Sequence, residues 1–387
     1  MKILWASNYS SQSGYSIQSR LFVPRLKQAG HEVVVFELSN GQRLTSISAG
    51  IKILPIALDP LGSDIFFQHV QRENAHVVIT LTDAWGLSAE VMKQLNWFPY
   101  APVDTQPIAP AVEHALRHCK RPIAMSRYGE AQMQKAGLDP FYMPHAIDPA
   151  IWHPGDKAQA RRTIGIDPHI FFVSFVGVND SVPSRKGIPE MLMAWQIFSA
   201  KHPDSVLYLH TTKKGRLAAN NMWGVDIDRL LTLFEINRDT IKFADEYDIY
   251  TSFPAHKMAT IAQAADVLLL PTRGEGFGLP VLEYAAVGTP SIVTDFATSP
   301  ELNFGGWLLE YEPEWSWQHT LVAKPGVQSI VEALEAAYAD RDNPDRARHC
   351  IEGARDYHID HVFSTYTLPV VQEIAEYALD HVMEGVQ

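Results

Sequence analysis

The sequence predicts an α/β protein with two doubly wound domains, each a parallel sheet with helices on both faces. Short apolar runs rich in β-branched residues alternate with longer helical patterns, which is typical of parallel sheets. The alternating series pauses and then restarts near residue 171. The chain of 387 residues also exceeds what one hydrophobic core usually holds.

The first series of strands is expected in the amino-terminal part of the chain. Between its first two strands lies a helical pattern whose apolar Ile17, Leu21, Phe22 and Leu26 share one face, and Gly30 suits a carboxyl-terminal cap. The expected strands are residues 2–7, 31–38, 51–58, 76–83, 98–103, 121–126 and 141–147.

The second series follows a segment, residues 148–168, in which Pro and Gly cluster and apolar strands cease. We therefore predict a linker near residues 150–168 and domains at 1–160 and 161–362. A final helical stretch, 363–387, lacks a strand of its own and is expected to pack back on the first domain. The strands of the second series are expected at residues 171–179, 205–212, 241–247, 266–272 and 290–296.

Composition excludes several classes of protein. A net charge of −12 argues against general attraction to nucleic acid or anionic membrane surfaces. The two cysteines, Cys119 and Cys350, lie far apart, which argues against a disulfide scaffold or zinc ribbon and fits a reducing compartment. The chain has no run of 18 apolar residues and its first apolar run is too short for a signal peptide, so we expect a cytoplasmic protein without a transmembrane segment.

The stretch PTRGEGFGLPVLEYAAVGTPSIVTD, residues 271–295, carries the clearest chemistry. It follows a buried strand and reads as a glycine-rich loop that leads into a helix with Pro280 at its first position. Amides at such a helix start are unpaired and suit an anion such as a diphosphate. Gly276 and Gly278 would let a ligand approach the backbone closely.

Two carboxylates flank this loop. Glu275 lies on the loop and Glu283 is expected in the first turn of the helix. Beside a diphosphate both would be repelled unless they bind hydroxyl groups of the same ligand, so we expect contacts to a sugar and to a ribose. The alternative is that Glu283 complements the helix dipole and Glu275 is a solvated loop charge.

The segment EGFGLPVLEYAAVGTPSIVTD resembles the signature of the retaining glycosyltransferases of family 4, in which seven residues separate two glutamates. Three other segments resemble the same family in order and spacing. The resemblance covers most of the chain, is strongest over residues 171–301 and is weaker before residue 120. The other segments are residues 143–154, 171–195 and 258–272.

This resemblance implies the GT-B fold, with two tandem Rossmann-like domains and an interdomain cleft. It implies transfer of a sugar from a nucleotide diphosphate sugar to an acceptor hydroxyl with retained anomeric configuration. The family's pattern assigns Lys186 to the donor diphosphate, the backbone of Phe277, Gly278 and Leu279 to donor contacts, and Gly14 to a glycine loop near the phosphates. Alternatively, Phe277 and Leu279 are core contacts, and the residues around Gly14 only cap a helix.

The chain departs from the family at two places. Val178 and Asn179 stand where the family usually has a Gly-Arg pair, and Arg185 is the candidate to replace that arginine. On the first domain, Asp104 stands about where the family often has a histidine near the reacting carbon. Asp104, like Asp83 on the preceding strand end, has a helix cap as its alternative role.

We therefore expect Glu275, Lys186 and Asp104 to serve catalysis, with no cofactor and no obligatory metal beyond the donor substrate. Asp226 in VDIDRL sits at a helix start and is expected to be a cap, not a metal ligand. The acceptor is a glycan, lipid, protein or small molecule, which the sequence leaves open. Two further hypotheses are an epimerase or hydrolase of the same fold, and a sugar-nucleotide-binding protein with a decayed site.

Overall fold

The computed structural model describes residues 1–39, 43–218, 221–251 and 253–384, and it divides into two compact units. Unit 1 comprises residues 1–146, 316–320 and 357–387, and unit 2 comprises 147–315 and 321–356. The predicted boundary after residue 160 falls inside helix α6 (Lys157–Ile164). The last three residues of the predicted final helix lie outside the described part of the chain.

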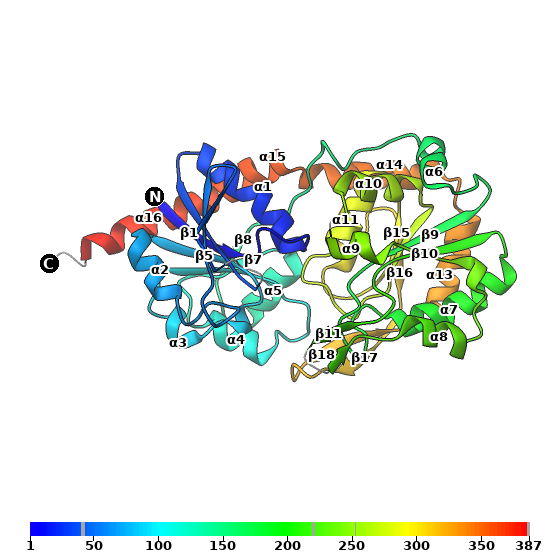
Figure 1. Ribbon diagram of the computed structural model, residues 1–387, viewed down its shortest axis with the longest axis horizontal. Helices are drawn as coiled ribbons and strands as arrows, with labels where there is room; N and C mark the ends of the chain where they lie inside the picture. The colour runs from blue at the N-terminus through cyan, green and yellow to red at the C-terminus, as the bar shows by residue number, and fades with distance from the viewer. Residues whose placement is uncertain (40–42, 219–220, 252, 385–387) are drawn as a thin grey trace. The chain divides into compact units, whose positions relative to one another are not determined.

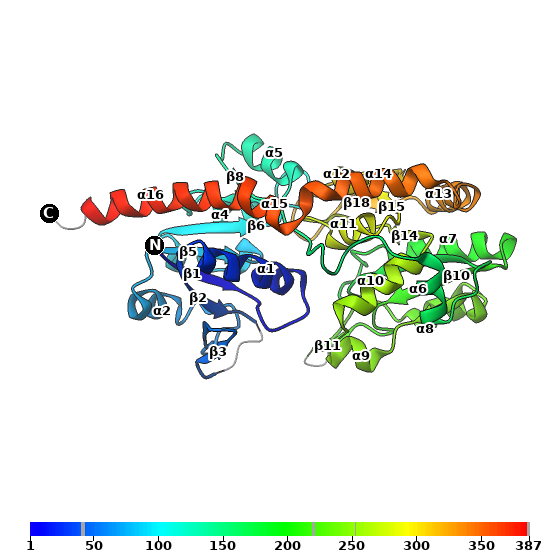
Figure 2. The ribbon, with the colours of Figure 1, turned by 90° about the horizontal axis from the view of Figure 1, so that it is seen from above.

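Unit 1 is built on an eight-stranded sheet in the order β3-β4-β2-β1-β5-β6-β7-β8. Every neighbouring pair is parallel except β3 and β4, which are antiparallel. Helices lie on both sides of this sheet (Figure 2). The strands are β1 (Lys2–Ser7), β2 (Glu32–Glu37), β3 (Ser46–Ser48), β4 (Ile51–Leu54), β5 (Val77–Leu81), β6 (Trp97–Ala101), β7 (Ile123–Ala124) and β8 (Phe141–Tyr142).

A capping hydrogen bond fixes the start of the first helix of unit 1. Helix α1 begins at Gly14 because the Ser13 side chain accepts a hydrogen bond from the Ser16 amide. Its Phe22 packs between the rings of Trp5 and Tyr100, which ties α1 to strands β1 and β6. The helices are α1 (Gly14–Gln28), α2 (Phe66–Glu73), η1 (Ala84–Gly86), α3 (Ala89–Met92), α4 (Pro110–Leu116), α5 (Arg127–Lys135), α15 (Ile359–Val362), η4 (Phe363–Thr367) and α16 (Leu368–Glu384).

The end of the chain belongs to unit 1, although more than two hundred residues separate it from the sheet in sequence. The ring of Tyr377 on α16 meets Phe98 of β6 edge-on with centroids 5.6 Å apart, and Tyr366 meets Tyr142 of β8 at 5.3 Å. Helix α16 runs along this unit in both views (Figures 1 and 2). These contacts make the last helices part of the core layer that covers the sheet of unit 1.

Unit 2 is built on a six-stranded parallel sheet in the order β13-β10-β9-β14-β15-β16, with two separate hairpins, β11-β12 and β17-β18. Because β9 and β14 are neighbours, the loops that leave their carboxyl ends lie side by side. The strands are β9 (Phe171–Val176), β10 (Ser205–His210), β11 (Arg216–Ala218), β12 (Asn221–Trp223), β13 (Ile241–Phe243), β14 (Val267–Leu270), β15 (Ser291–Thr294), β16 (Trp307–Leu309), β17 (Tyr311–Trp315) and β18 (Leu321–Pro325).

Helices cover both faces of the second sheet as well (Figure 2). Asp226 caps α8 by accepting a hydrogen bond from the Arg229 amide, which confirms the predicted cap. No described helix is both long and apolar enough to cross a bilayer. Besides α6, the helices are α7 (Ile188–Lys201), α8 (Ile227–Leu233), η2 (Arg238–Thr240), α9 (Glu246–Thr251), α10 (Ala255–Ala264), α11 (Leu279–Ala286), α12 (Ser299–Leu302), α13 (Val327–Ala339), α14 (Pro344–Ala354) and η3 (Arg355–Tyr357).

Candidate functional site

The glycine-rich loop between β14 and α11 presents free amides at a helix start. Gly278 adopts a left-handed conformation, with φ of 95°, and directly precedes the first residue of α11, Leu279. In the part of the chain that the structure describes, the amides of Gly276, Gly278 and Leu279 donate to no protein acceptor. The Thr298 hydroxyl anchors the loop by donating a hydrogen bond to the Gly276 carbonyl at 3.1 Å. This loop can therefore receive an anion.

A buried ion pair joins this loop to the one that follows β9. The Lys186 ammonium donates to Glu275 Oε1 at 2.5 Å, and both side chains are about nine-tenths buried. The Arg185 guanidinium lies 3.6 Å from the same oxygen, donates to the Gly274 carbonyl and is 40% exposed. Lys186 and Glu275 are 89 positions apart in sequence, and the fold brings these two predicted site residues together with a third, Arg185. Their summed charge is +1, which favours an added anion.

The environment of this ion pair perturbs both groups. Burial lowers the pKa of the Lys186 ammonium, a trend that Glu275 opposes and Arg185 reinforces. Burial raises the pKa of Glu275, but Lys186, Arg185 and hydrogen bonds from Lys186 and Thr272 more than offset this and lower it below its usual range. Glu275 is therefore held as a carboxylate. It is also shielded from water, and its charge therefore acts strongly on its neighbours.

Arg273 fixes the relative position of the two loops and was not among the residues predicted from the sequence. Its side chain is buried, donates to the Ser184 carbonyl at 2.9 Å and to Glu190 of α7 at 2.7 Å, and also pairs with Glu314. Its amide donates to the Arg185 carbonyl at 2.7 Å. The only sequence signal was an arginine placed directly after a buried strand. Arg273 is a positioning residue for Lys186 and Glu275.

Glu283 lies deeper in helix α11 than the sequence predicted. The helix begins at Leu279, so Glu283 is its fifth residue and no acidic residue occupies the first turn. The expectation that it sits in the first turn is wrong, and a dipole-complementing role loses its basis. Its carboxyl group has no hydrogen bond or ion pair among the described residues, and burial raises its pKa to about 8.

This raised pKa predicts a stability effect of the substitution Glu283→Gln that depends on pH. Between the ordinary value near 4.5 and about 8, the folded protein holds a proton that the unfolded chain has lost, so this group lowers stability as pH rises through that window. Gln removes the penalty. We expect little effect near pH 4.5 and stabilisation of about 1–3 kcal/mol at pH 8, because partial exposure of the side chain reduces the full effect.

The comparison is made by urea unfolding at both pH values. Glu312→Gln, which changes an exposed carboxylate on β17 of the same unit, is the matched control. It should change the free energy of unfolding by the same amount at both pH values. A stabilisation by Glu283→Gln that is equal at pH 4.5 and pH 8, or smaller at pH 8, would refute the assignment.

Asn179, which stands where the family usually has arginine, has a structural role. Its side-chain amide donates to the Val225 and Thr212 carbonyls, and its side-chain oxygen accepts from the Val225 amide at 2.8 Å. The residue is 1% exposed. Asn179 therefore joins the end of β9 to the segment before α8. The nearby cations of this loop are Arg185 and Lys186.

Gly14 and Asp104, the remaining predicted residues, belong to unit 1. Gly14 is the first residue of α1, and Asp104 follows β6. Neither Asp104 nor Asp83 caps a helix through its side chain: α4 has Ala109 at its cap position, and Asp83 precedes η1 without a capping hydrogen bond. Because β5 and β6 are neighbours, the two aspartates lie at the same edge of the sheet.

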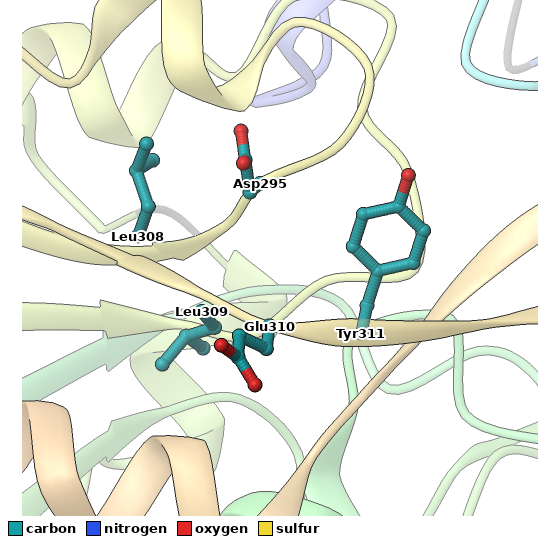
Figure 3. A pocket seen from close by; sticks show the side chains of 5 residues that line it. All are labelled: Asp295, Leu308, Leu309, Glu310 and Tyr311. Carbon is teal, nitrogen blue, oxygen red and sulfur yellow. The ribbon is translucent and has the colours of Figure 1, made fainter.

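Two hollows mark the carboxyl edges of the sheets. In unit 2, a hollow of about 340 Å³ is lined by Asp295, Glu310, Tyr311, Leu308 and Leu309 (Figure 3). Its two carboxylates make it unfavourable for a diphosphate, and it includes none of the predicted residues. In unit 1, a hollow of about 210 Å³ lies where β1, β2 and β5 end, and it is lined by Asn8, Tyr15, Ser39, Leu61, Thr82, Asp83, Trp85 and Gly86.

Residues 173–340, which contain the loops around Lys186 and Glu275, match the family model of the group 1 glycosyl transferases. Over part of its length the chain is also similar to curated D-inositol 3-phosphate glycosyltransferases. That of Pseudarthrobacter chlorophenolicus is 30% identical over 154 residues, which are 39% of this chain and 33% of the relative. That of Segniliparus rotundus is 26% identical over 178 residues, 46% and 35% of the two chains. The matches thus span about a third of these relatives' length.

Solved structures extend the similarity to the whole chain at the level of the fold. Sucrose-phosphate synthase from Thermosynechococcus elongatus superposes with a TM-score of 0.74 at 18% identity, over 97% of this chain and 98% of that one. HepE from Anabaena, solved with UDP-glucose, gives 0.71 at 14% identity over 98% and 100%. The chain has the GT-B fold of these proteins, and its residues 173–340 match the model of the group 1 glycosyl transferases.

Proposed function

We propose that this protein transfers a sugar from a nucleoside diphosphate sugar to an acceptor hydroxyl, with retention of the anomeric configuration. The observation that carries the proposal is the buried Lys186–Glu275 pair beside the free amides of Gly276, Gly278 and Leu279. It lies within the segment that matches the group 1 family. An anion site, a buried cation and a carboxylate within one small volume suit a ligand that has both phosphates and hydroxyls.

The donor's diphosphate is assigned to the amides of Gly276, Gly278 and Leu279 together with Lys186 and Arg185. Its arrival would let Lys186 share its charge between Glu275 and phosphate oxygens, so that no charge in this buried place is left unpaired. Glu275 then accepts hydrogen bonds from the sugar hydroxyls. Glu283, which has no partner among the described residues, is available for the ribose hydroxyls.

The reaction breaks the bond between the anomeric carbon and the diphosphate oxygen and forms a bond from that carbon to the acceptor oxygen. The acceptor's proton passes to the departing diphosphate on the same face of the sugar, which retains the configuration and needs no side-chain base. Lys186 and the loop amides stabilise the negative charge that develops on the leaving group. With these cationic groups at the phosphates, we propose that no metal is obligatory.

The acceptor is assigned to unit 1, where Asp104 is proposed to orient the attacking hydroxyl and Gly14 to allow close approach of the chain to the donor. The assignment rests on position: Gly14 begins the helix that follows β1, and Asp104 lies in the segment that follows β6. The substitution Asp104→Asn tests this assignment, because the loss of a residue that acts on the acceptor should change KM for the acceptor and leave KM for the donor unchanged.

Donor binding is tested first by thermal shift with UDP-, GDP-, ADP- and dTDP-sugars, in the presence of EDTA. UDP-glucose leads the panel because HepE, whose fold this chain shares, was solved with it. We expect one donor to raise the melting temperature, since a ligand present at about 100 times its Kd stabilises by roughly 2.7 kcal/mol. Lys186→Met should abolish the shift.

Turnover of that donor, followed by NMR of the anomeric proton, identifies the reaction. Sugar that appears on an acceptor with unchanged configuration supports the proposal. Sugar released into water indicates a hydrolase, and an altered sugar on the nucleotide indicates an epimerase. A donor that binds but is never consumed, across a broad panel of acceptors, would leave only a binding protein.

A further inference from the structure

Two charged side chains beside the loop that joins β1 to α1 have no part in the proposed mechanism. Glu37 is the last residue of β2 and is 3% exposed, and Arg20 lies half-buried on α1. Both bind the backbone of this loop, residues 8–13. A charge taken out of water needs such partners, because its desolvation is costly.

Glu37 holds the start of the loop. Strands β1 and β2 are parallel neighbours in which Ser7 pairs with Glu37, so the carboxylate lies next to the point where β1 ends. Glu37 Oε1 accepts a hydrogen bond from the Ser10 amide at 2.6 Å, and Oε2 accepts one from the Ser10 hydroxyl at 2.9 Å. Such bonds to a carboxylate are stronger than those between neutral groups. Ser10 is therefore fixed to β2 through both its backbone and its side chain.

Arg20 holds the same loop from α1. Its Nη1 atom donates to the carbonyl of Tyr9 at 2.6 Å and to that of Ser11 at 2.8 Å. Burial lowers the pKa of the guanidinium, an effect that Tyr9 and Glu37 oppose, and an arginine in a protein keeps its charge. The two carbonyls are therefore directed at a permanent cation.

Arg20 and Glu37 act on the two ends of one peptide group. In a trans peptide, the carbonyl of one residue and the amide of the next point in opposite directions. Here the Tyr9 carbonyl points to Arg20 and the Ser10 amide points to Glu37, so the cation and the carboxylate lie on opposite sides of the same peptide group. Rotation of this group by half a turn would set its carbonyl against the carboxylate and its N–H against the guanidinium. The two charges thus hold the peptide group in one orientation.

Serine hydroxyls order the rest of the loop. Ser11 Oγ lies 2.6 Å from Ser16 Oγ and 3.0 Å from Ser13 Oγ, and the Ser13 side chain caps α1. Gly14 follows directly as the first residue of α1. The loop therefore has one shape before a ligand arrives, and little ordering entropy is lost when a ligand binds.

From this arrangement we infer that Arg20 and Glu37 are positioning residues for the donor. They hold the peptide group between Tyr9 and Ser10 in one orientation, and so keep the loop in the shape in which Gly14 can approach the donor diphosphate. The inference rests on the proposed function, which assigns Gly14 to that approach. Neither charged side chain touches the donor. Their contribution is the same before and during the reaction, so KM for the donor, and not kcat, should depend on it.

Substitutions that remove either charge test the inference. Arg20→Met and Glu37→Met should each raise KM for the donor about tenfold and leave kcat and KM for the acceptor within about twofold of wild type, because the donor must then order the loop. Glu37→Gln is the conservative rescue. Its side-chain oxygen still accepts from the Ser10 amide and its NH₂ group donates to the Ser10 hydroxyl, so KM for the donor should stay within about threefold of wild type. Arg25→Met is the control: it breaks an exposed pair with Asp360 on the same helix α1 and should change none of these constants.

Hydrogen exchange followed by mass spectrometry examines the loop without donor. Peptides that cover residues 8–14 should exchange faster in Arg20→Met and Glu37→Met than in the wild-type protein, and at the wild-type rate in Arg25→Met. A merely structural role would lower the melting temperature of the two variants while KM for the donor stayed at the wild-type value. That result would overturn the inference, as would unchanged exchange of the loop or an equal rise in KM for donor and acceptor.

The two proposals fail in different ways. No thermal shift with any donor and no turnover would refute the proposed function, and with it the role of the loop in donor binding. Turnover by the wild-type protein, together with an unchanged KM for the donor in both methionine variants, would overturn the inference alone and leave the transferase intact.

Discussion

Lys186→Met is expected to lower kcat/KM for sugar transfer by a factor of about 10²–10³, equivalent to a loss of roughly 2.7–4 kcal/mol of transition-state stabilisation. The ammonium is the buried cation of the loop pair and is assigned to the departing diphosphate. Glu275→Gln should cost a similar factor, since it removes the carboxylate assigned to the sugar hydroxyls. Initial rates with saturating acceptor, at several donor concentrations, separate the loss of binding from the loss of turnover.

The double variant Lys186→Met/Glu275→Gln separates catalysis from folding. Each single variant leaves one buried charge without its main partner, which destabilises, although Arg185 lies 3.6 Å from Glu275 and softens the loss in Lys186→Met. The double variant removes both charges and should recover stability but not activity. Lys201→Met, at the last residue of α7, breaks the exposed pair with Glu335 of α13 and should change neither stability nor activity. Near wild-type turnover in either single variant would remove that residue from the site.

Gly187→Ala is expected to be the most destabilising small substitution near the site. Gly187 follows Lys186 and has φ of 64°, and a β-carbon there would lie 2.1 Å from the Pro271 carbonyl oxygen. The backbone oxygen cannot give way without separating the two loops that carry Lys186 and Glu275. We expect a loss of about 3 kcal/mol or more, or a drop of roughly 6–12 °C in the melting temperature of unit 2.

Gly165→Ala is the matched control for this substitution. Gly165 ends α6 in the same unit with φ of 71°, and a β-carbon there would meet nothing within 4 Å. It should show only the backbone cost of a left-handed alanine, about 1 kcal/mol. The difference between the two variants, measured by thermal melts followed by circular dichroism, isolates the close approach. Equal losses of stability in the two variants would show that the two loops do not need the close approach of Gly187 to Pro271.

Much of the sheet architecture could be predicted because buried parallel strands leave an apolar run in the sequence. The predicted strands at 171–179 and 266–272 correspond to β9 and β14, each slightly shorter than expected. The β17–β18 hairpin was missed because its strands, YEPEW and LVAKP, are polar and contain proline, which argues against a strand. The edge strand β16 was missed as well, being only three residues long.

The residues of the candidate site could be predicted from the sequence, but the contacts between them could not. Glycine spacing and the family resemblance selected Glu275 and Lys186, but their ion pair depends on β9 and β14 being neighbours, which strand order in sequence does not specify. The role of Arg273 depends on burial, and that of Asn179 on two carbonyls from a distant segment. Trp85 follows no spacing rule, so only the hollow draws attention to it.

The return of α15 and α16 to unit 1 also affects the order in which the protein forms during synthesis. Nascent domains usually fold in order from the amino terminus. Here Phe98 packs against Tyr377. The sheet of unit 1 therefore cannot be fully covered until residues that leave the ribosome after all of unit 2 have emerged. The later-encoded unit is therefore expected to fold first, and an exposed face of the earlier one is a natural client for chaperones until translation ends.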